Sequence, residues 1–105
     1  MARVLVVDDE PGVRESLRLV LRDEFEVDLA ASVDEALARL VEEPPDLVLL
    51  DLVMPGRSGF ELLSEIGARP GAPSVIVLTG TTAVATAVEP RRTGLRFVRP
   101  IRLAA

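Results

Sequence analysis

The chain has 105 residues, of which 49% are hydrophobic and 28% charged, as is typical of one small packed domain and unlike a disordered segment. It contains no Cys and no His, and all twelve of its basic residues are Arg. These absences exclude disulfides, cysteine nucleophiles, histidine bases, zinc held by thiolates or imidazoles, and lysine Schiff bases. We therefore expect residues 1–105 to form a single domain in which any metal is held by oxygen atoms.

The formal net charge of −5 is unevenly distributed along the chain. All seventeen acidic residues lie within residues 1–90, whereas residues 91–105 carry five Arg and no acid. An acidic body argues against nucleic acid as the main partner, because binding to a phosphate backbone needs clustered cations. No apolar run approaches membrane-spanning length or resembles a signal peptide. We expect a cytoplasmic protein that binds neither nucleic acid nor a membrane.

The first half of the chain alternates predicted strands and helices. Residues 3–7 form an apolar run rich in β-branched residues, typical of a strand buried on both faces, and Pro11 suits the first turn of a following helix. Residues 25–29 alternate apolar and acidic side chains, which predicts a strand at a sheet edge. A capping box that begins at Ser32 predicts a second helix, and Pro44 ends it.

The second half continues the same alternation. Residues 46–51 predict another fully buried strand, and a capping box at Ser58 predicts a third helix. Residues 75–78 predict a further buried strand, residues 83–88 a short helix, and residues 95–98 a last strand.

This order predicts an α/β fold, with a doubly wound, mostly parallel sheet, helices on both faces and right-handed crossovers. Helical spacing predicts that the apolar side chains of each helix, including Val20 and Val41, face the core. In such sheets ligands bind beyond the carboxyl ends of the strands. The oxygen-bearing side chains that the sequence places at these strand ends are Asp8, Asp9, Asp51 and Thr79.

Three carboxylates at one sheet edge, with no Lys or His to neutralise them, predict a hard divalent cation, and we expect Mg²⁺. Mg²⁺ usually keeps positions open for phosphoryl oxygens. A carboxylate beside such a cation can attack phosphorus to give an acyl phosphate, and we assign that role to Asp51. A simpler hypothesis is that Asp8 and Asp9 only cap the first helix, but it does not explain the carboxylate of Asp51 at the same edge.

Three motifs, taken together, carry a resemblance to a known family. In this order and at this spacing, the chain over residues 3–94 resembles the receiver domains of two-component response regulators. Residues 86–89 further resemble the receivers of bacterial enhancer-binding transcription activators. The motifs are Leu5-Val6-Val7-Asp8-Asp9-Glu10-Pro11, then Asp46-Leu47-Val48-Leu49-Leu50-Asp51 with Met54-Pro55-Gly56 and Gly59, and lastly Val75-Ile76-Val77-Leu78-Thr79-Gly80.

The resemblance implies the five-stranded, flavodoxin-like sheet of order 2-1-3-4-5. It also implies that a sensor histidine kinase phosphorylates Asp51. Mg²⁺ would then be held by Asp8, Asp9, Asp51 and the backbone carbonyl of Val53.

Two features depart from the family. Thr79 and Gly80 match the phosphate-contact and switch positions of the family. Arg99, however, stands before Pro100 where the family has Lys. The Arg side chain keeps the positive charge but is bulkier and planar. The chain ends at Ala105, so the family's fifth helix is essentially absent and one sheet face would be uncovered. Because an uncovered apolar face seeks a partner, we expect a homodimer.

Two other functions share parts of this pattern. A haloacid-type, magnesium-dependent hydrolase needs a second Asp two residues after the nucleophile, and Val53 occupies that position. A degenerate receiver that is never phosphorylated and serves as a binding or dimerisation module stays open, because Arg99 and the missing helix both favour it. As a phosphoacceptor receiver, the domain would be a switch rather than a turnover enzyme.

Overall fold

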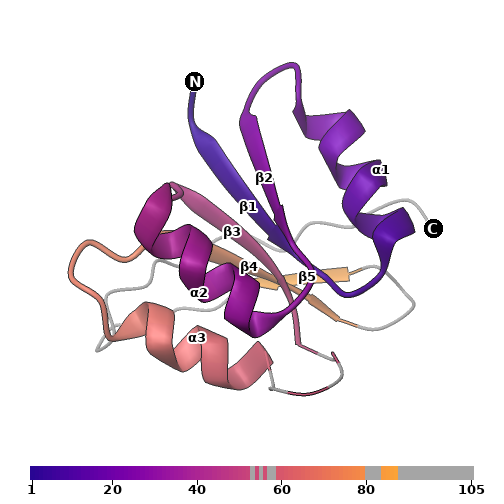
Figure 1. Cartoon of the computed structure of the whole chain (residues 1–105). Coiled ribbons are helices and arrows are strands. Elements are labelled where there is room, and N and C mark those ends of the chain that lie inside the picture. The colour runs from indigo at the N-terminus through magenta and orange to yellow at the C-terminus, as the bar shows by residue number, and fades with distance from the viewer. Residues whose placement is uncertain (53, 55, 57–58, 80–83, 88–105) are drawn as a thin grey trace.

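The computed structural model describes residues 1–52, 54, 56, 59–79 and 84–87, which form a central sheet with helices on both faces (Figure 1). The strands are β1 (Arg3–Val7), β2 (Glu26–Ala30), β3 (Leu47–Asp51), β4 (Ser74–Thr79) and β5 (Val84–Ala87). The helices are α1 (Pro11–Leu21), α2 (Val33–Glu42) and α3 (Gly59–Gly67). Four strands are parallel in the order β2-β1-β3-β4, and β5 lies at the outer side of β4. The predicted doubly wound α/β fold is confirmed.

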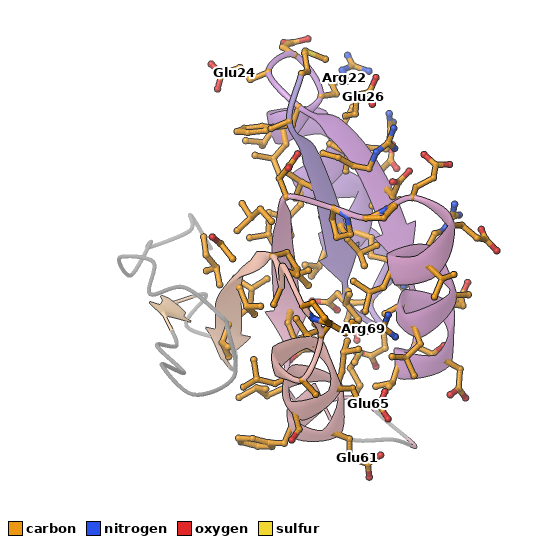
Figure 2. All side chains as sticks on the ribbon, turned by 90° about the vertical axis from the view of Figure 1, so that its left-hand side faces the viewer. Arg22, Glu24, Glu26, Glu61, Glu65 and Arg69 are labelled. Carbon is orange, nitrogen blue, oxygen red and sulfur yellow. The ribbon has the colours of Figure 1, made fainter. Side chains whose placement is uncertain are left out.

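Side chains that alternate along the strands supply two cores, one on each face of the sheet. Helices α2 and α3 cover one face and α1 covers the other (Figure 1). The sticks in Figure 2 fill the space between sheet and helices, while Glu61 of α3 projects outward. On the face of α2 and α3 the buried strand side chains are Leu5, Val7, Ala30, Val48, Leu50, Val75 and Val77. On the face of α1 they are Val4, Val6, Leu49, Ile76 and Leu78.

The helices begin close to the predicted positions but bury fewer apolar residues than expected. Helix α1 has Pro11 in its first turn, and Leu17, 8% exposed, is its one buried side chain. The prediction that Val20 and Val41 face the core is wrong, since they are 75% and 69% exposed. Each helix contacts the sheet through a narrow row of side chains, so apolar residues beside that row stay exposed to solvent. None of the helices in the described part of the chain is long and apolar enough to cross a membrane.

The predicted N-cap of α2 forms, but the reciprocal bond of the capping box goes to Ala31, the residue before the cap, instead of to Ser32. The Oγ atom of Ser32 accepts a hydrogen bond of 3.2 Å from the backbone N–H of Glu35, and the Glu35 carboxylate accepts one of 2.9 Å from the N–H of Ala31. Two backbone donors at the start of the helix are thereby satisfied by side chains.

We expect Ser32→Ala to lower the free energy of unfolding by about 1 kcal/mol, because the cap bond is lost. Chemical denaturation monitored by circular dichroism measures this loss. Ser16→Ala is the matched control, since Ser16 is exposed within α1 and Ala is the better helix former. Equal destabilisation by both substitutions would show that the cap bond does not matter.

Strand β5 corrects one prediction. Residues 84–87 form a strand antiparallel to β4, where a short helix was expected. A parallel crossover needs about a dozen residues, and only residues 80–83 separate the two strands, so the chain returns antiparallel. The β-branched Val84 and Thr86 alternate with Ala, the period of a strand. The strand expected at residues 95–98 and the final helix concern residues outside the described part of the chain.

At the sheet edge opposite the carboxyl ends of the strands, Arg3 joins four acids. Its guanidinium forms ion pairs with Glu26 at 2.6 Å, Asp28 at 2.9 Å and Glu43 at 2.6 Å, and its backbone N–H donates to Asp46 at 2.8 Å. These contacts connect the starts of β1 and β2 to the chain before β3. They hold the strands in register at the end of the sheet that lies opposite the carboxyl ends of the strands.

Candidate functional site

Strand register brings the acids together. Val7 of β1 pairs with Leu50 of β3, and Leu50 pairs with Val77 of β4, so these strands reach the same edge of the sheet side by side. Asp8 follows Val7 directly, and Asp51 follows Leu50 directly. Parallel strands thus place the two acids at neighbouring positions of the carboxyl edge, although they are 43 positions apart in the sequence.

Asp8, Asp9 and Asp51 form one carboxylate cluster at this edge. Each residue offers a carboxylate oxygen, and these three atoms all lie within 4.8 Å of one another. Asp8 is buried, with 5% of its surface exposed, and the other two are half-buried. The structure therefore brings together the three carboxylates that the sequence placed at this edge.

Asp8 is held in place from three sides. Its backbone N–H donates to the carbonyl of Ala30 at 3.1 Å, and its Oδ1 accepts from the backbone N–H of Glu10 at 2.8 Å. Its own carbonyl accepts from Nη1 of Arg14 at 2.6 Å. Strand β2, the β1–α1 turn and helix α1 thus each fix one group of Asp8, and its carboxylate is oriented before any ligand binds.

The electrostatics of the cluster disfavour its ionised form. Burial raises the pKa of Asp8, and the negative charges of Asp51, Asp9 and Glu10 raise it further, against the opposing hydrogen bond from the Glu10 N–H. Three carboxylates crowded at a partly dry edge repel one another unless a cation joins them.

This donor set fits Mg²⁺. The ligand atoms are carboxylate oxygens, the type that hard divalent cations prefer, and they converge from two strand ends to within 4.8 Å of one another. Neutralising a buried carboxylate also relieves the repulsion that raises the pKa of Asp8. The residues that would hold the ion are Asp8, Asp9 and Asp51.

Helix α3 begins in close contact with the backbone at the end of β3. The first residue of α3, Gly59, is buried beside the backbone of Asp51 and Leu52, and Met54 packs against the core on that side of the sheet. Met54 is therefore a packing residue. The cluster thus rests on α3 as well as on the strands.

The other predicted site residues are placed only in part. The backbone of Thr79 ends β4 at the same edge of the sheet. Val53, Gly80 and Arg99 lie outside the residues that the structure describes.

One contact was not expected from the sequence. Arg14 reaches from α1 to the carbonyl of Asp8, six positions earlier, while helical periodicity only assigns Arg14 to the polar side of α1. Cations are common on such surfaces, so no sequence signal distinguishes Arg14 from Arg18, which pairs with Glu15 one turn away.

Comparison with known proteins agrees with this geometry. The transcriptional regulatory protein ResD of Bacillus subtilis is 41% identical over 88 residues, which are 83% of this chain and 36% of ResD. The hydrogenase transcriptional regulatory protein HoxA of Cupriavidus necator is 43% identical over 81 residues, 77% of this chain and 17% of HoxA. The chain thus spans about a third of ResD and a smaller part of HoxA.

Among solved structures, the response regulator TrrA of Thermotoga maritima superimposes with a TM-score of 0.70 at 44% identity, over 75% of this chain and 70% of TrrA. That crystal contains Mg²⁺ and BeF. TrrA in complex with the histidine kinase ThkA gives a TM-score of 0.70 at 43% identity, over 76% of this chain and 70% of TrrA. Residues 4–102 match the response regulator receiver domain family, and this chain belongs to that family.

Proposed function

We propose that this receiver domain accepts a phosphoryl group on Asp51 in a Mg²⁺-dependent reaction. The observation that carries the proposal is the cluster of Asp8, Asp9 and Asp51 within 4.8 Å at the carboxyl edge of the sheet. The Mg²⁺ and BeF bound in the related TrrA crystal support the same chemistry for this chain.

In the proposed reaction a carboxylate oxygen of Asp51 attacks phosphorus in line with the leaving group. A new P–O bond forms as the bond between phosphorus and the donor breaks, and the bonding electron pair leaves with the donor. With a phosphohistidine donor this is a P–N bond, and the imidazole keeps the electron pair. With a small acyl phosphate it is a P–O bond, and a carboxylate leaves.

The residues around Asp51 would bind the metal ion that the reaction needs. Bound Mg²⁺ would supply positive charge for the equatorial phosphoryl oxygens. Asp8 and Asp9 would hold the ion, Asp8 from the orientation that Glu10 already imposes on its carboxylate.

The remaining assignments rest on the family resemblance. We assign the backbone carbonyl of Val53 to the metal, and Thr79, Gly80 and Arg99 to the phosphoryl group. These roles are proposals, and substitution of each residue in the phosphorylation assay tests them.

We propose a sensor histidine kinase as the natural donor, which the complex of ThkA with the related TrrA supports. The domain, taken as residues 1–105, would then act as a stoichiometric switch in the cytoplasm rather than as a turnover enzyme. Homodimer formation stays a prediction. Size-exclusion chromatography with light scattering tests it, and a stable monomer at micromolar concentration would contradict it.

Intact-mass spectrometry tests the proposed function. The chain is incubated with acetyl phosphate and Mg²⁺, and in parallel with acetyl phosphate and EDTA. We expect a mass increase of one phosphoryl group with Mg²⁺ and none with EDTA, because the donor's charge would not be balanced without the ion. A folded chain that takes up no phosphoryl group in either condition would instead favour the unphosphorylated binding module.

A further inference from the structure

The first residue of α3 lies against the backbone of the site with no room for a side chain. A Cβ atom built on Gly59 would lie 2.6 Å from the carbonyl oxygen of Asp51 and 2.7 Å from Cα of Leu52. Real Cβ atoms do not approach other atoms this closely. The obstructing atoms belong to the backbone, so a side-chain rotation cannot relieve the clash.

This requirement for glycine concerns packing rather than backbone conformation. Gly56 and Gly71 have φ angles of 81° and 66°, in the left-handed region, and a Cβ on either would meet nothing within 4 Å. Gly59 begins a right-handed helix and has no such φ angle. Its small size is needed because helix and strand end come into direct contact.

The structure leaves few ways to make room for a larger residue at this position. Helix α3 is anchored in the core by Leu62 and Ile66, whose side chains have no exposed surface. Strand β3 is paired with β1 and β4 up to Leu50, and its last residue, Asp51, pairs with Leu78 of β4. The atoms that a larger residue at position 59 would meet are those of the Asp51 and Leu52 backbone.

We propose that Gly59 is a positioning residue for Asp51. By letting α3 touch the backbone of residues 51 and 52, it sets the place of the Asp51 carboxylate relative to Asp8 and Asp9. This inference rests on the proposed function of Asp51. A cation with near-octahedral geometry and ligand distances of about 2.0–2.1 Å tolerates little displacement of a ligand, and misplacement of a reacting group by about 1 Å can cost about a hundredfold in rate.

The experiment compares Gly59→Ala with Gly12→Ala. Gly12 lies near the start of α1, and a Cβ there meets nothing within 4 Å, so the same chemical change is made without a clash. For each variant we would measure Mg²⁺ affinity by calorimetry, the backbone amide shifts of residues 51 and 52, and the rate of phosphorylation by acetyl phosphate.

We expect Gly59→Ala to fold, to bind Mg²⁺ at least about tenfold more weakly, and to be phosphorylated about tenfold to a hundredfold more slowly. Its amide shifts should change at residues 51 and 52. Gly12→Ala should match the wild type in all three measurements.

A variant in the same helix separates positioning from general stability. Ile66→Val removes one buried methylene of α3 about two helical turns after Gly59, and should lower the melting temperature while leaving Mg²⁺ affinity unchanged. Wild-type Mg²⁺ affinity in Gly59→Ala would overturn the proposal, as would equal loss of affinity in Ile66→Val. An unfolded Gly59→Ala would also overturn it, since the residue would then support the whole fold.

Failure of the proposed function gives a different result. A wild type that binds Mg²⁺ but takes up no phosphoryl group would overturn the proposed function, and the Mg²⁺ affinity of the variants would still report on the position of Asp51.

Discussion

Asp51→Asn is expected to lower phosphorylation by acetyl phosphate at least a hundredfold, to the background of the assay. The substitution keeps the shape of the side chain but removes the charged oxygen that would attack phosphorus, and an amide is a poor nucleophile. Because Asp51 lies at the end of β3 rather than within the core, the fold should persist. Intact-mass spectrometry measures the loss, and circular dichroism confirms the fold.

Asp23→Asn is the control for this experiment. Asp23 is an exposed acid in the turn between α1 and β2, so the control makes the same change of charge far from the site. It should be phosphorylated like the wild type. Phosphorylation of a folded Asp51→Asn protein at the wild-type level would mean that another residue accepts the phosphoryl group.

Asp8→Asn should make the metal-free domain more stable at neutral pH. Burial and the neighbouring acids raise the pKa of Asp8, so its ionisation in the folded state costs free energy. An acid whose pKa is higher in the folded than in the unfolded chain contributes fully to stability below its unfolded pKa, and that contribution is lost as pH rises through its folded pKa. The Asn side chain removes the penalty, and its oxygen can still accept from the N–H of Glu10.

We therefore expect the melting temperature of Asp8→Asn in EDTA to exceed that of the wild type near pH 7 by an amount on the order of a few degrees. The difference should shrink as pH falls through the window between the raised folded pKa and the ordinary carboxyl pKa. Added Mg²⁺ should stabilise the wild type progressively and the variant much less, because the variant lacks one carboxylate ligand.

The order of the two melting temperatures should then invert at high Mg²⁺. Asp23→Asn again serves as the charge control and should respond to Mg²⁺ as the wild type does. A variant that gains as much stability from Mg²⁺ as the wild type would remove Asp8 from the proposed metal site.

Three of the four parallel strands, β1, β3 and β4, could be predicted from uninterrupted apolar runs, and β2 from its alternating apolar and acidic side chains. A strand buried on both faces needs an uninterrupted run such as residues 4–7 or 47–50, and the acid that ends each run marks the sheet edge. The convergence of Asp8 and Asp51 followed from the rule that parallel strands end at the same edge.

What the sequence could not predict depends on tertiary contacts. Residues 84–87 have a helix-tolerant composition rich in Ala, and their pairing with β4 decides that they form a strand. The exposure of Val20 depends on how α1 lies across β1 and β2. The bond from Arg14 to Asp8 and the contact of Gly59 with Asp51 depend on the spacing between helix and strand, which periodicity does not report.

The most direct test of the account is to locate the phosphoryl group chemically. The wild-type chain is phosphorylated with acetyl phosphate and Mg²⁺, the acyl phosphate is reduced with borohydride, and the peptides are sequenced by mass spectrometry. An aspartyl phosphate becomes homoserine in this reaction, so the account predicts homoserine at position 51 and Asp at positions 8 and 9. Homoserine at any other position, with Asp retained at 51, would contradict it.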